Sequence, residues 1–273
     1  MSFSEYERSL ASGKPIRLYR FKRGVMRWLY NTGDRDLVIG SEVYRAVRGG
    51  IIDDGMNWSG NPDQDDLDIT APFDIEVAQL YRPFPPSAEV ELEVFDIHYG
   101  DSQAVATWAG SIATVDWPKA DRCTITCRSI EASMERPGLV DTYSLSCTAV
   151  LGDVKCRVDL NAYRVTTVLQ SVTGASVSSG AFAAYPVGWF TGGYVEWAIG
   201  SGEFERRHIE GHNGSVLQLL GGIAGISAGM EVRVYPGCDF LSTTCNSKFD
   251  NAINFRGEPH LQGESPFNGA NIW

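Results

Sequence analysis

The stretch EVELEVFDIH, residues 89–98, decides the fold class predicted for this chain. Val90, Leu92 and Val94 alternate with glutamates, and alternate side chains of a β-strand point to opposite faces of its sheet. This pattern predicts a half-buried antiparallel strand with an apolar inner face and an acidic outer face.

Segments on both sides of this stretch repeat the pattern. IRLYRF at 16–21, EVYRAV at 42–47 and RCTITC at 122–127 resemble further short strands, separated by turn residues. A run of such strands is typical of an antiparallel meander rather than of alternating strands and helices. We therefore predict a mainly β protein with an N-terminal antiparallel β domain over residues 1–145.

The character of the sequence changes after Cys156. Residues 164–233 are rich in glycine, serine and valine, which predicts a small inserted β domain with glycine turns. The flanking segments, 146–163 and 234–273, would form a discontinuous, loop-rich domain that holds four of the six cysteines.

Two short helices are predicted at the ends of the chain. A capping box formed by Ser2 and Glu5 predicts a helix over residues 2–11. A second helix is predicted over residues 248–255, because Gly257 and Pro259 follow it as stop signals.

The net charge of −11 argues against broad binding of nucleic acids or anionic membranes, both of which favour basic surfaces. Residues 1–48 hold ten Lys or Arg and five Asp or Glu, whereas residues 53–76 hold eight acidic residues and no Lys or Arg. These segments form either two solvated faces or complementary faces through which copies of the chain, or neighbouring proteins, dock.

The N-terminal sequence MSFSEYERSL carries acidic and polar residues where a secretory signal has an apolar run. No apolar stretch is long enough to cross a bilayer, so we expect no stable membrane insertion. We expect the chain to fold in a reducing cytosol. Close cysteines there bind metal or stay free more often than they form disulfides.

Cys123 and Cys127 share one face of a predicted strand, together with Ile125. The rise along a strand separates their positions by about 13 Å, which is too far for one metal ion. We predict that both thiols pack in the core as small apolar groups.

Cys147, Cys156, Cys238 and Cys245 form two pairs, and each pair brackets a loop-like segment. Four such thiolates are a candidate metal site, although zinc knuckles have tighter spacings and longer loops suit an iron–sulfur cluster better. Core packing and rare disulfides remain alternatives at this point. A site of this kind would clamp the C-terminal segment and contribute to its folding free energy.

Other patterns give weaker indications of chemistry. His208 and His212 have a spacing that zinc sites use on helices, but their surroundings predict a strand. Cys245 and His260 could form a thiol–imidazole pair, but no third group is indicated. The acidic run NPDQDDLD at 61–68 lacks the glycine and distal glutamate of a calcium loop and predicts an acidic turn.

Two segments of the sequence resemble a known family. LSCTAVLGDVKC at 145–156 and YPGCDFLSTTCNSKFDNAINFRGEPH at 235–260 are similar to the C-terminal part of phage tail-tip and baseplate hub proteins. That family includes the hub protein of gene transfer agents and the lambda tail-tip protein L. The N-terminal segment at 28–72, WLYNTGDRDLVIGSEVYRAVRGGIIDDGMNWSGNPDQDDLDITAP, resembles the N-terminal β domain of the same family.

The resemblance implies a structural, non-enzymatic protein at the tip of a siphophage-like virion tail, assembled in the host cytoplasm. It implies a homotrimer between the ring that ends the tail tube and the central fibre or receptor-binding proteins. It also implies an iron–sulfur cluster, which we expect to be of the 4Fe-4S type, held by the following residues: Cys147, Cys156, Cys238 and Cys245. The alternatives are an iron–sulfur redox protein and a zinc-stabilised binding module.

Overall fold

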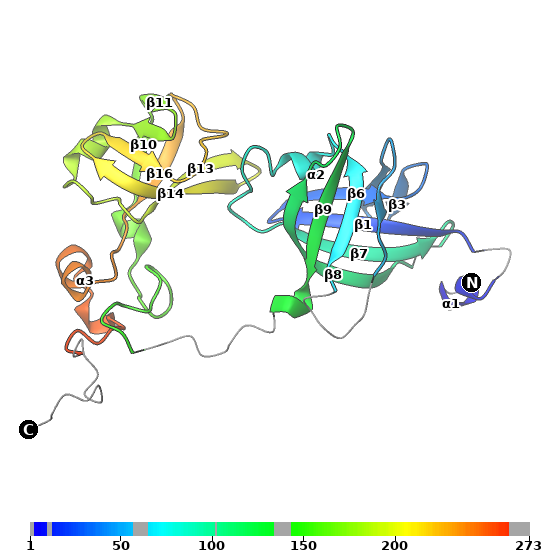
Figure 1. Cartoon of the computed structure of the whole chain (residues 1–273), viewed down its shortest axis with the longest axis horizontal. Coiled ribbons are helices and arrows are strands. Elements are labelled where there is room, and N and C mark those ends of the chain that lie inside the picture. Colours follow the sequence, from blue (N-terminus) through cyan, green and yellow to red (C-terminus); the bar gives the residue numbers. More distant parts are fainter. Residues whose placement is uncertain (1–2, 10–12, 57–64, 102, 134–142, 262–273) are drawn as a thin grey trace, which may run out of the picture. The chain divides into compact units, whose positions relative to one another are not determined.

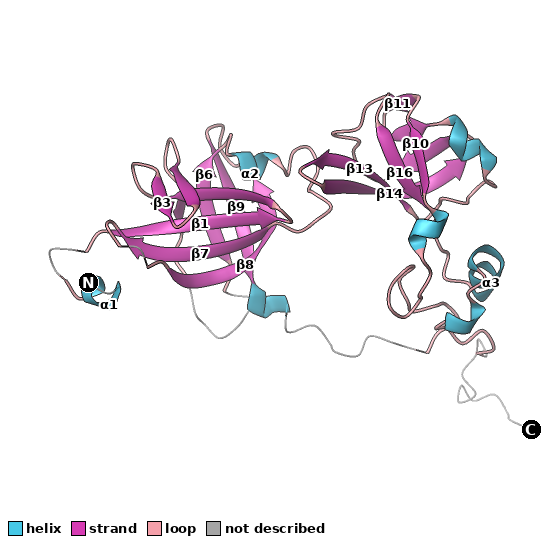
Figure 2. Cartoon of the chain, turned by 180° about the vertical axis from the view of Figure 1, so that it is seen from behind, coloured by secondary structure: helices cyan, strands magenta, loops and turns pink. Residues whose placement is uncertain are grey.

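The computed structural model of the chain describes residues 3–9, 13–56, 65–101, 103–133 and 143–261. The chain folds as two compact units: unit 1, Met1–Arg136 with Gly200–Glu203, and unit 2, Pro137–Ile199 with Phe204–Trp273. Strands dominate both units and the helices are short (Figure 1, Figure 2), which confirms the predicted mainly β fold. The finer division at residues 145, 163 and 233 stays a prediction. Among the described residues, no helix is both long and apolar enough to span a membrane.

Within the described residues, unit 1 is built on a nine-stranded sheet with the order β3-β4-β2-β1-β7-β8-β9-β6-β5. Neighbouring strands pair antiparallel, except for the parallel pair β2–β4. The strands are β1 (Pro15–Arg23), β2 (Met26–Asn31), β3 (Leu37–Ile39), β4 (Glu42–Ala46), β5 (Ile52–Asp53), β6 (Leu67–Pro72), β7 (Glu91–His98), β8 (Val105–Asp116) and β9 (Arg122–Ser129). The helical elements are α1 (Phe3–Glu7), α2 (Glu76–Gln79) and the 3-10 turn η1 (Ile130–Ser133).

The stretch at 89–98 leads into β7, and its side chains alternate as predicted. The fully buried side chains of its first half are Val90, Leu92 and Val94. Glu91 is exposed on the opposite face, where Glu93 pairs with Arg20 and Lys22 of β1. The predicted acidic face is therefore partly neutralised within unit 1.

The sheet of unit 1 curls until its last strand, β5, reaches β1. Arg17 of β1 forms an ion pair with Asp53 of β5, with 2.6 Å between Nη1 and Oδ1, although these strands are not neighbours in the sheet. Arg17 also forms a two-pronged pair with Asp96, its cross-strand partner on β7, at 2.8 and 3.3 Å. The Arg17 side chain thus ties three strands together.

Within the described part of unit 2, a seven-stranded sheet has the order β10-β16-β13-β14-β15-β12-β11. Its strands are β10 (Val165–Val168), β11 (Ser171–Thr173), β12 (Ser176–Ser178), β13 (Tyr194–Gly200), β14 (Glu203–Asn213), β15 (Val216–Leu219) and β16 (Glu231–Tyr235). The helical elements are η2 (Leu160–Tyr163), η3 (Gly180–Ala184), α3 (Ser242–Phe249) and η4 (Ala252–Asn254).

In chain order, β10 is the first strand of this sheet and β16 is the last, and these two strands pair with each other. Antiparallel pairing of β10 with β16 places Val165 opposite Val234. The chain therefore enters and leaves the sheet at neighbouring positions, beside the segments that carry the four cysteines.

Both predicted helices differ from the observed ones. Among the described residues 3–9, the first helix covers Phe3–Glu7 (α1), and the chain then turns with a hydrogen bond from Ser9 N–H to the carbonyl of Tyr6. Residues 2, 10 and 11 of that prediction lie outside the described residues. The second begins earlier than predicted, at Ser242, and ends at Phe249. Asp250 stops it by adopting a left-handed conformation, with φ of 48°.

Candidate functional site

The fold of unit 2 brings four cysteines from two distant segments to one cavity. These cysteines are Cys147, Cys156, Cys238 and Cys245. The other side chains around the cavity are mostly apolar: Ala149, Leu151, Val158, Phe240, Leu241, Phe249, Asn254 and Phe255. The whole second sheet lies in the chain between the two halves of this cysteine site.

The carboxylate of Asp153 shapes the first cysteine loop. It accepts hydrogen bonds from the backbone N–H groups of Val150 at 3.0 Å, Lys155 at 2.9 Å and Cys156 at 2.6 Å. The bond from Cys156 is the main reason why the pKa of Asp153 lies below its usual value. This loop folds back on itself, so that Cys147 and Cys156 face the same cavity.

A close crossing of two backbone segments positions Cys238. A Cβ atom on Gly237 would lie 1.8 Å from the carbonyl oxygen of Thr191, and one on Gly193 would lie 2.1 Å from that of Tyr235. Only glycine permits this approach, because any side chain would collide with the backbone. Helix α3 then carries Cys245 to the cavity.

Hydrogen bonds join the two cysteine segments directly. The N–H group of Cys147 donates to the carbonyl of Phe240 at 2.8 Å. The buried side chain of Asn251, in the second segment, donates to the carbonyl of Cys156 in the first at 2.6 Å. Within the second segment, the backbone N–H of Asn251 donates to the carbonyl of Cys245 at 3.1 Å. The sequence analysis did not predict this bridge, although Asn251 lies within the stretch 235–260 that resembles the hub family.

Three of the four sulfur atoms accept hydrogen bonds from N–H donors. Phe240 N–H donates to Cys238 Sγ at 3.3 Å, and Arg256 N–H donates to Cys147 Sγ at 3.4 Å. The side-chain amide of Asn251 lies 3.8 Å from Cys156 Sγ. Such donors stabilise thiolates, the form in which cysteine binds metals.

Burial has the opposite effect and disfavours the thiolate form of the cysteines. It raises the pKa of the Cys238 and Cys245 thiols, and the proximity of the other cysteines raises both further. Four thiolates in this cavity therefore require a positively charged partner.

The chemistry of the donor set fits a group bound by thiolates. The described residues that line the cavity include four thiols, no carboxylate or imidazole, and mostly apolar side chains. Sets of four cysteines bind zinc or iron–sulfur clusters in proteins. In the described residues, however, no group of three or more His, Cys, Asp or Glu side chains has the arrangement to hold one metal ion.

The remaining predicted candidates lie elsewhere. Cys123 and Cys127 of β9 are fully buried in the core of unit 1, which confirms their predicted packing. His208 is exposed and His212 is buried on β14, because an irregularity in the pairing at 209–211 turns the strand. Residues 61–64 of the acidic run lie outside the described residues, and Asp65 and Leu67 are buried.

His260 is exposed, whereas the Cys245 thiol donates a hydrogen bond to the carbonyl of Asn251 at 3.3 Å. The structure therefore gives the Cys245 thiol a backbone partner rather than an imidazole partner.

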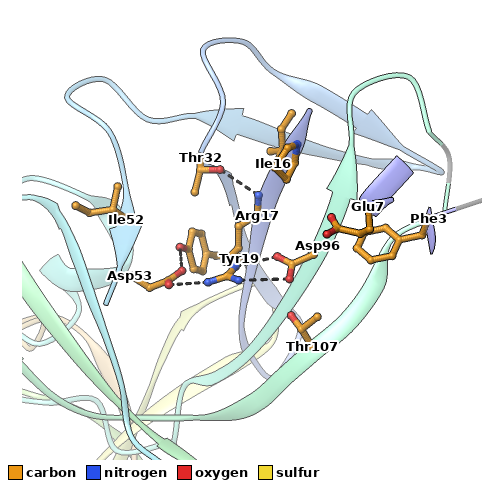
Figure 3. A pocket seen from close by; sticks show the side chains of 11 residues that line it. Phe3, Glu7, Ile16, Arg17, Tyr19, Thr32, Ile52, Asp53, Asp96 and Thr107 are labelled. Atoms are coloured by element: carbon orange, nitrogen blue, oxygen red, sulfur yellow. Dashed lines mark hydrogen bonds and ion pairs between the residues drawn. The ribbon is translucent and has the colours of Figure 1, made fainter. Parts of the chain in front are cut away.

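A second cavity, of about 600 Å3, lies in unit 1 between α1 and the sheet (Figure 3). Arg17 lines this cavity and donates hydrogen bonds to both Asp53 and Asp96. The Tyr19 hydroxyl donates a hydrogen bond to Asp53. Burial tends to raise the pKa of Asp53, but the bonds from Arg17 and Tyr19 outweigh it and hold this pKa below its usual value. Both carboxylates are held by one guanidinium, which is typical of a structural ion-pair network.

Comparison with known proteins identifies relatives of both parts of the chain. The family described as "Baseplate hub protein, N-terminal attachment domain" matches residues 17–159, and the family described as "Phage conserved hypothetical protein BR0599" matches residues 188–265. An uncharacterized protein of Xylella fastidiosa (strain 9a5c) is 27% identical over 124 residues, which cover 41% of this chain and 25% of that protein. The match thus spans a quarter of the relative's length.

A chain in the solved structure titled "Virion of native gene transfer agent (GTA) particle" has the same fold. It superposes with a TM-score of 0.80 and 23% sequence identity, over 96% of this chain and 93% of that one. The first family match covers more than half of the present chain. The protein therefore belongs to the family of phage baseplate hub proteins.

Proposed function

We propose that the chain acts at the tip of a siphophage-like tail, where it links the end of the tail tube to the central fibre or receptor-binding proteins. The description "attachment domain" for the family that matches residues 17–159 supports a docking role for that segment. In this proposal the chain is a homotrimer without enzymatic activity. It is assembled in the host cytoplasm and does not recognise nucleic-acid sequences.

The proposal includes an iron–sulfur cluster of the 4Fe-4S type, held by the cysteine site. The observation that carries it is the convergence of four thiols from two segments on one cavity. When bound, the cluster would supply four iron–thiolate bonds that crosslink the two segments. The cavity measures about 10 Å3, room for about one water molecule, so binding of a cluster would require the residues that line it to move apart.

The chain's own residues would prepare this site. Asp153 holds the first loop in shape, and Asn251 connects the first loop to the segment after α3. The N–H groups of Phe240 and Arg256 would donate to thiolate sulfurs. Because the cavity is walled by apolar side chains, a bound cluster would also be shielded from water.

Anaerobic purification of the full chain followed by metal analysis tests this proposal. A brown protein with broad visible absorption and iron and sulfide in a fixed ratio is the expected result. Zinc without sulfide would favour a zinc-stabilised binding module instead. A colourless, metal-free and fully folded protein would reject the cluster, whereas turnover of an electron acceptor would favour a redox protein.

A variant tests the link between the cysteine site and assembly. We expect Cys238→Ser to lower the yield of soluble protein and to block tail assembly, because one bond of the crosslink is lost. Infectious particles at the normal titre from this variant would contradict the proposed structural role. Cys127→Ala, which removes a thiol from the core of unit 1, is the matched control for tail assembly.

A further inference from the structure

Lys248 of α3 reaches from the cysteine site to a loop that precedes β13. Its ammonium group donates to the carbonyl of Gly237 at 2.7 Å and to the carbonyl of Trp189. Gly237 immediately precedes Cys238, so the first of these bonds fixes the peptide unit that carries one of the four cysteines.

The surroundings of this ammonium group are largely aromatic. It lies 4.7 Å from the centre of the Trp189 ring and 5.3 Å from that of Phe249. Such cation–aromatic contacts favour a charged lysine in a half-buried position. Burial lowers the pKa of Lys248, while the nearby Cys238 and Asp239 act in the opposite direction.

We propose that Lys248 is a positioning residue of the cysteine site: its ammonium fixes the Gly237–Cys238 peptide and offsets part of the negative charge of the bound thiolates. This inference rests on the proposed function, because it takes the cysteines as ligands of a cluster.

Two features of the chain make this position effective. The backbone at Gly237 already crosses the segment at 191–193 without room for a side chain, so a small shift of the Gly237 carbonyl also moves Cys238. Lys248 lies one helical turn after Cys245, which places it on the same face of α3 as that cysteine. Lys248 lies on the helix that carries Cys245, and its ammonium contacts the peptide unit that precedes Cys238.

A positive charge beside a cluster has a measurable consequence. A thiolate-bound cluster becomes more negative when it gains an electron, and a nearby ammonium favours that reduced form. Loss of the charge should therefore lower the reduction potential of the cluster. A lysine that only braced the fold would leave this potential unchanged.

The test compares variants of the full chain purified without oxygen. Lys248→Met removes the charge and the donors, and Lys248→Gln keeps a hydrogen-bond donor without the charge. Lys119→Met is the matched control, because it removes an exposed ammonium from unit 1, outside the cysteine site. The readouts are iron per chain, the rate of iron release to a chelator, and the reduction potential from a dye-mediated titration.

We expect Lys248→Met to release iron about tenfold faster than the wild type and to shift the reduction equilibrium about tenfold, which is about 59 mV for one electron. Lys248→Gln should show the shift in potential with a smaller change in release. Wild-type potential and release in both variants, with iron bound, would overturn the inference alone. A wild-type chain without iron would overturn the proposed cluster itself. If Lys248→Met does not fold, the potential of Lys248→Gln decides.

Discussion

Arg17 of β1 and Asp53 of β5 form an ion pair, with 2.6 Å between Nη1 and Oδ1, between strands that share no backbone pairing. The Asp53 side chain is 7% exposed and the Arg17 side chain 26% exposed, so this contact is only partly screened by solvent. With Asp96 as a second carboxylate partner, Arg17 joins the edge strand β5 to β1 and β7, which lie in the interior of the sheet order.

Removing the guanidinium should destabilise unit 1. We expect Arg17→Met to lower its free energy of unfolding by roughly 2 kcal/mol, less than for a fully buried pair because Arg17 is about a quarter exposed. Calorimetry of the full chain would resolve the transitions. The control is Arg27→Met, whose pair with Glu42 involves an exposed arginine and should cost less than about 1 kcal/mol. Equal effects of the two variants would contradict the role of Arg17 in linking β5 to β1 and β7.

The same pair should make unit 1 sensitive to acid. The folded-state pKa of Asp53 is lowered, so its stabilising contribution is complete above its unfolded pKa of about 3.9 and is lost as the pH falls through the lower folded value. The difference in unfolding temperature between wild type and Asp53→Asn should be largest near pH 7 and shrink below about pH 4. A difference that stays constant from pH 7 to pH 3 would contradict this assignment.

The six cysteines should separate into two classes of reactivity. Burial raises the pKa of Cys123 and, much more strongly, that of Cys127, so both should resist alkylation in the folded chain. After the iron of the proposed cluster is removed by a chelator, the partly exposed thiols of the cysteine site, Cys147 and Cys238, should be labelled first, while Cys123 and Cys127 stay unmodified. Mass spectrometry after brief iodoacetamide treatment gives the count. Early labelling of Cys127 would show that unit 1 opens.

Asn251 should hold the cysteine site together through the carbonyl of Cys156. We expect Asn251→Ala to cost about 1–3 kcal/mol, because a buried acceptor loses its partner. It should also speed the release of iron, as judged by the decay of visible absorption. Asn246→Ala, on the exposed face of α3, is the control and should behave like the wild type. An unchanged release rate in Asn251→Ala would refute the bridging role.

Gly237 should tolerate no side chain. In Gly237→Ala the new Cβ would lie 1.8 Å from Thr191 O, so the backbone crossing must open, at a cost of at least about 3 kcal/mol. The expected result is a lower yield of folded protein and a lower thermal transition of unit 2. At Gly180 a Cβ would lie 3.6 Å from the side-chain nitrogen of Gln170, an ordinary contact distance, so Gly180→Ala is the matched control. Comparable transitions for both variants would disprove the tight crossing.

The alternation of apolar and polar residues within single segments predicted the strands and the faces that they bury. The alternation before and within β7 predicted its buried face, and the shared face of Cys123 and Cys127 predicted their burial. Helix α3 was placed too late, because its first turn is built from serine and threonine, which are weak helix formers.

The candidate site was predictable as a set of four cysteines but not as a geometry. Asn251 and Lys248 act through backbone carbonyls of residues far away in the chain, and no local pattern identifies such partners. The same limit applies to His212, which turns inward at a strand irregularity that depends on pairing with β15.

The pairing of Val165 with Val234 has a consequence for how such chains vary in length. Because the two ends of the 164–233 segment lie side by side, that segment can be lengthened, shortened or exchanged without moving the residues that flank it. Hydrogen bonds between the two flanking cysteine segments close this long loop. The entropic cost of closing a loop rises only slowly with its length, so a longer segment would be tolerated. An insert of different length between Val165 and Val234 should therefore leave the cysteine site unchanged.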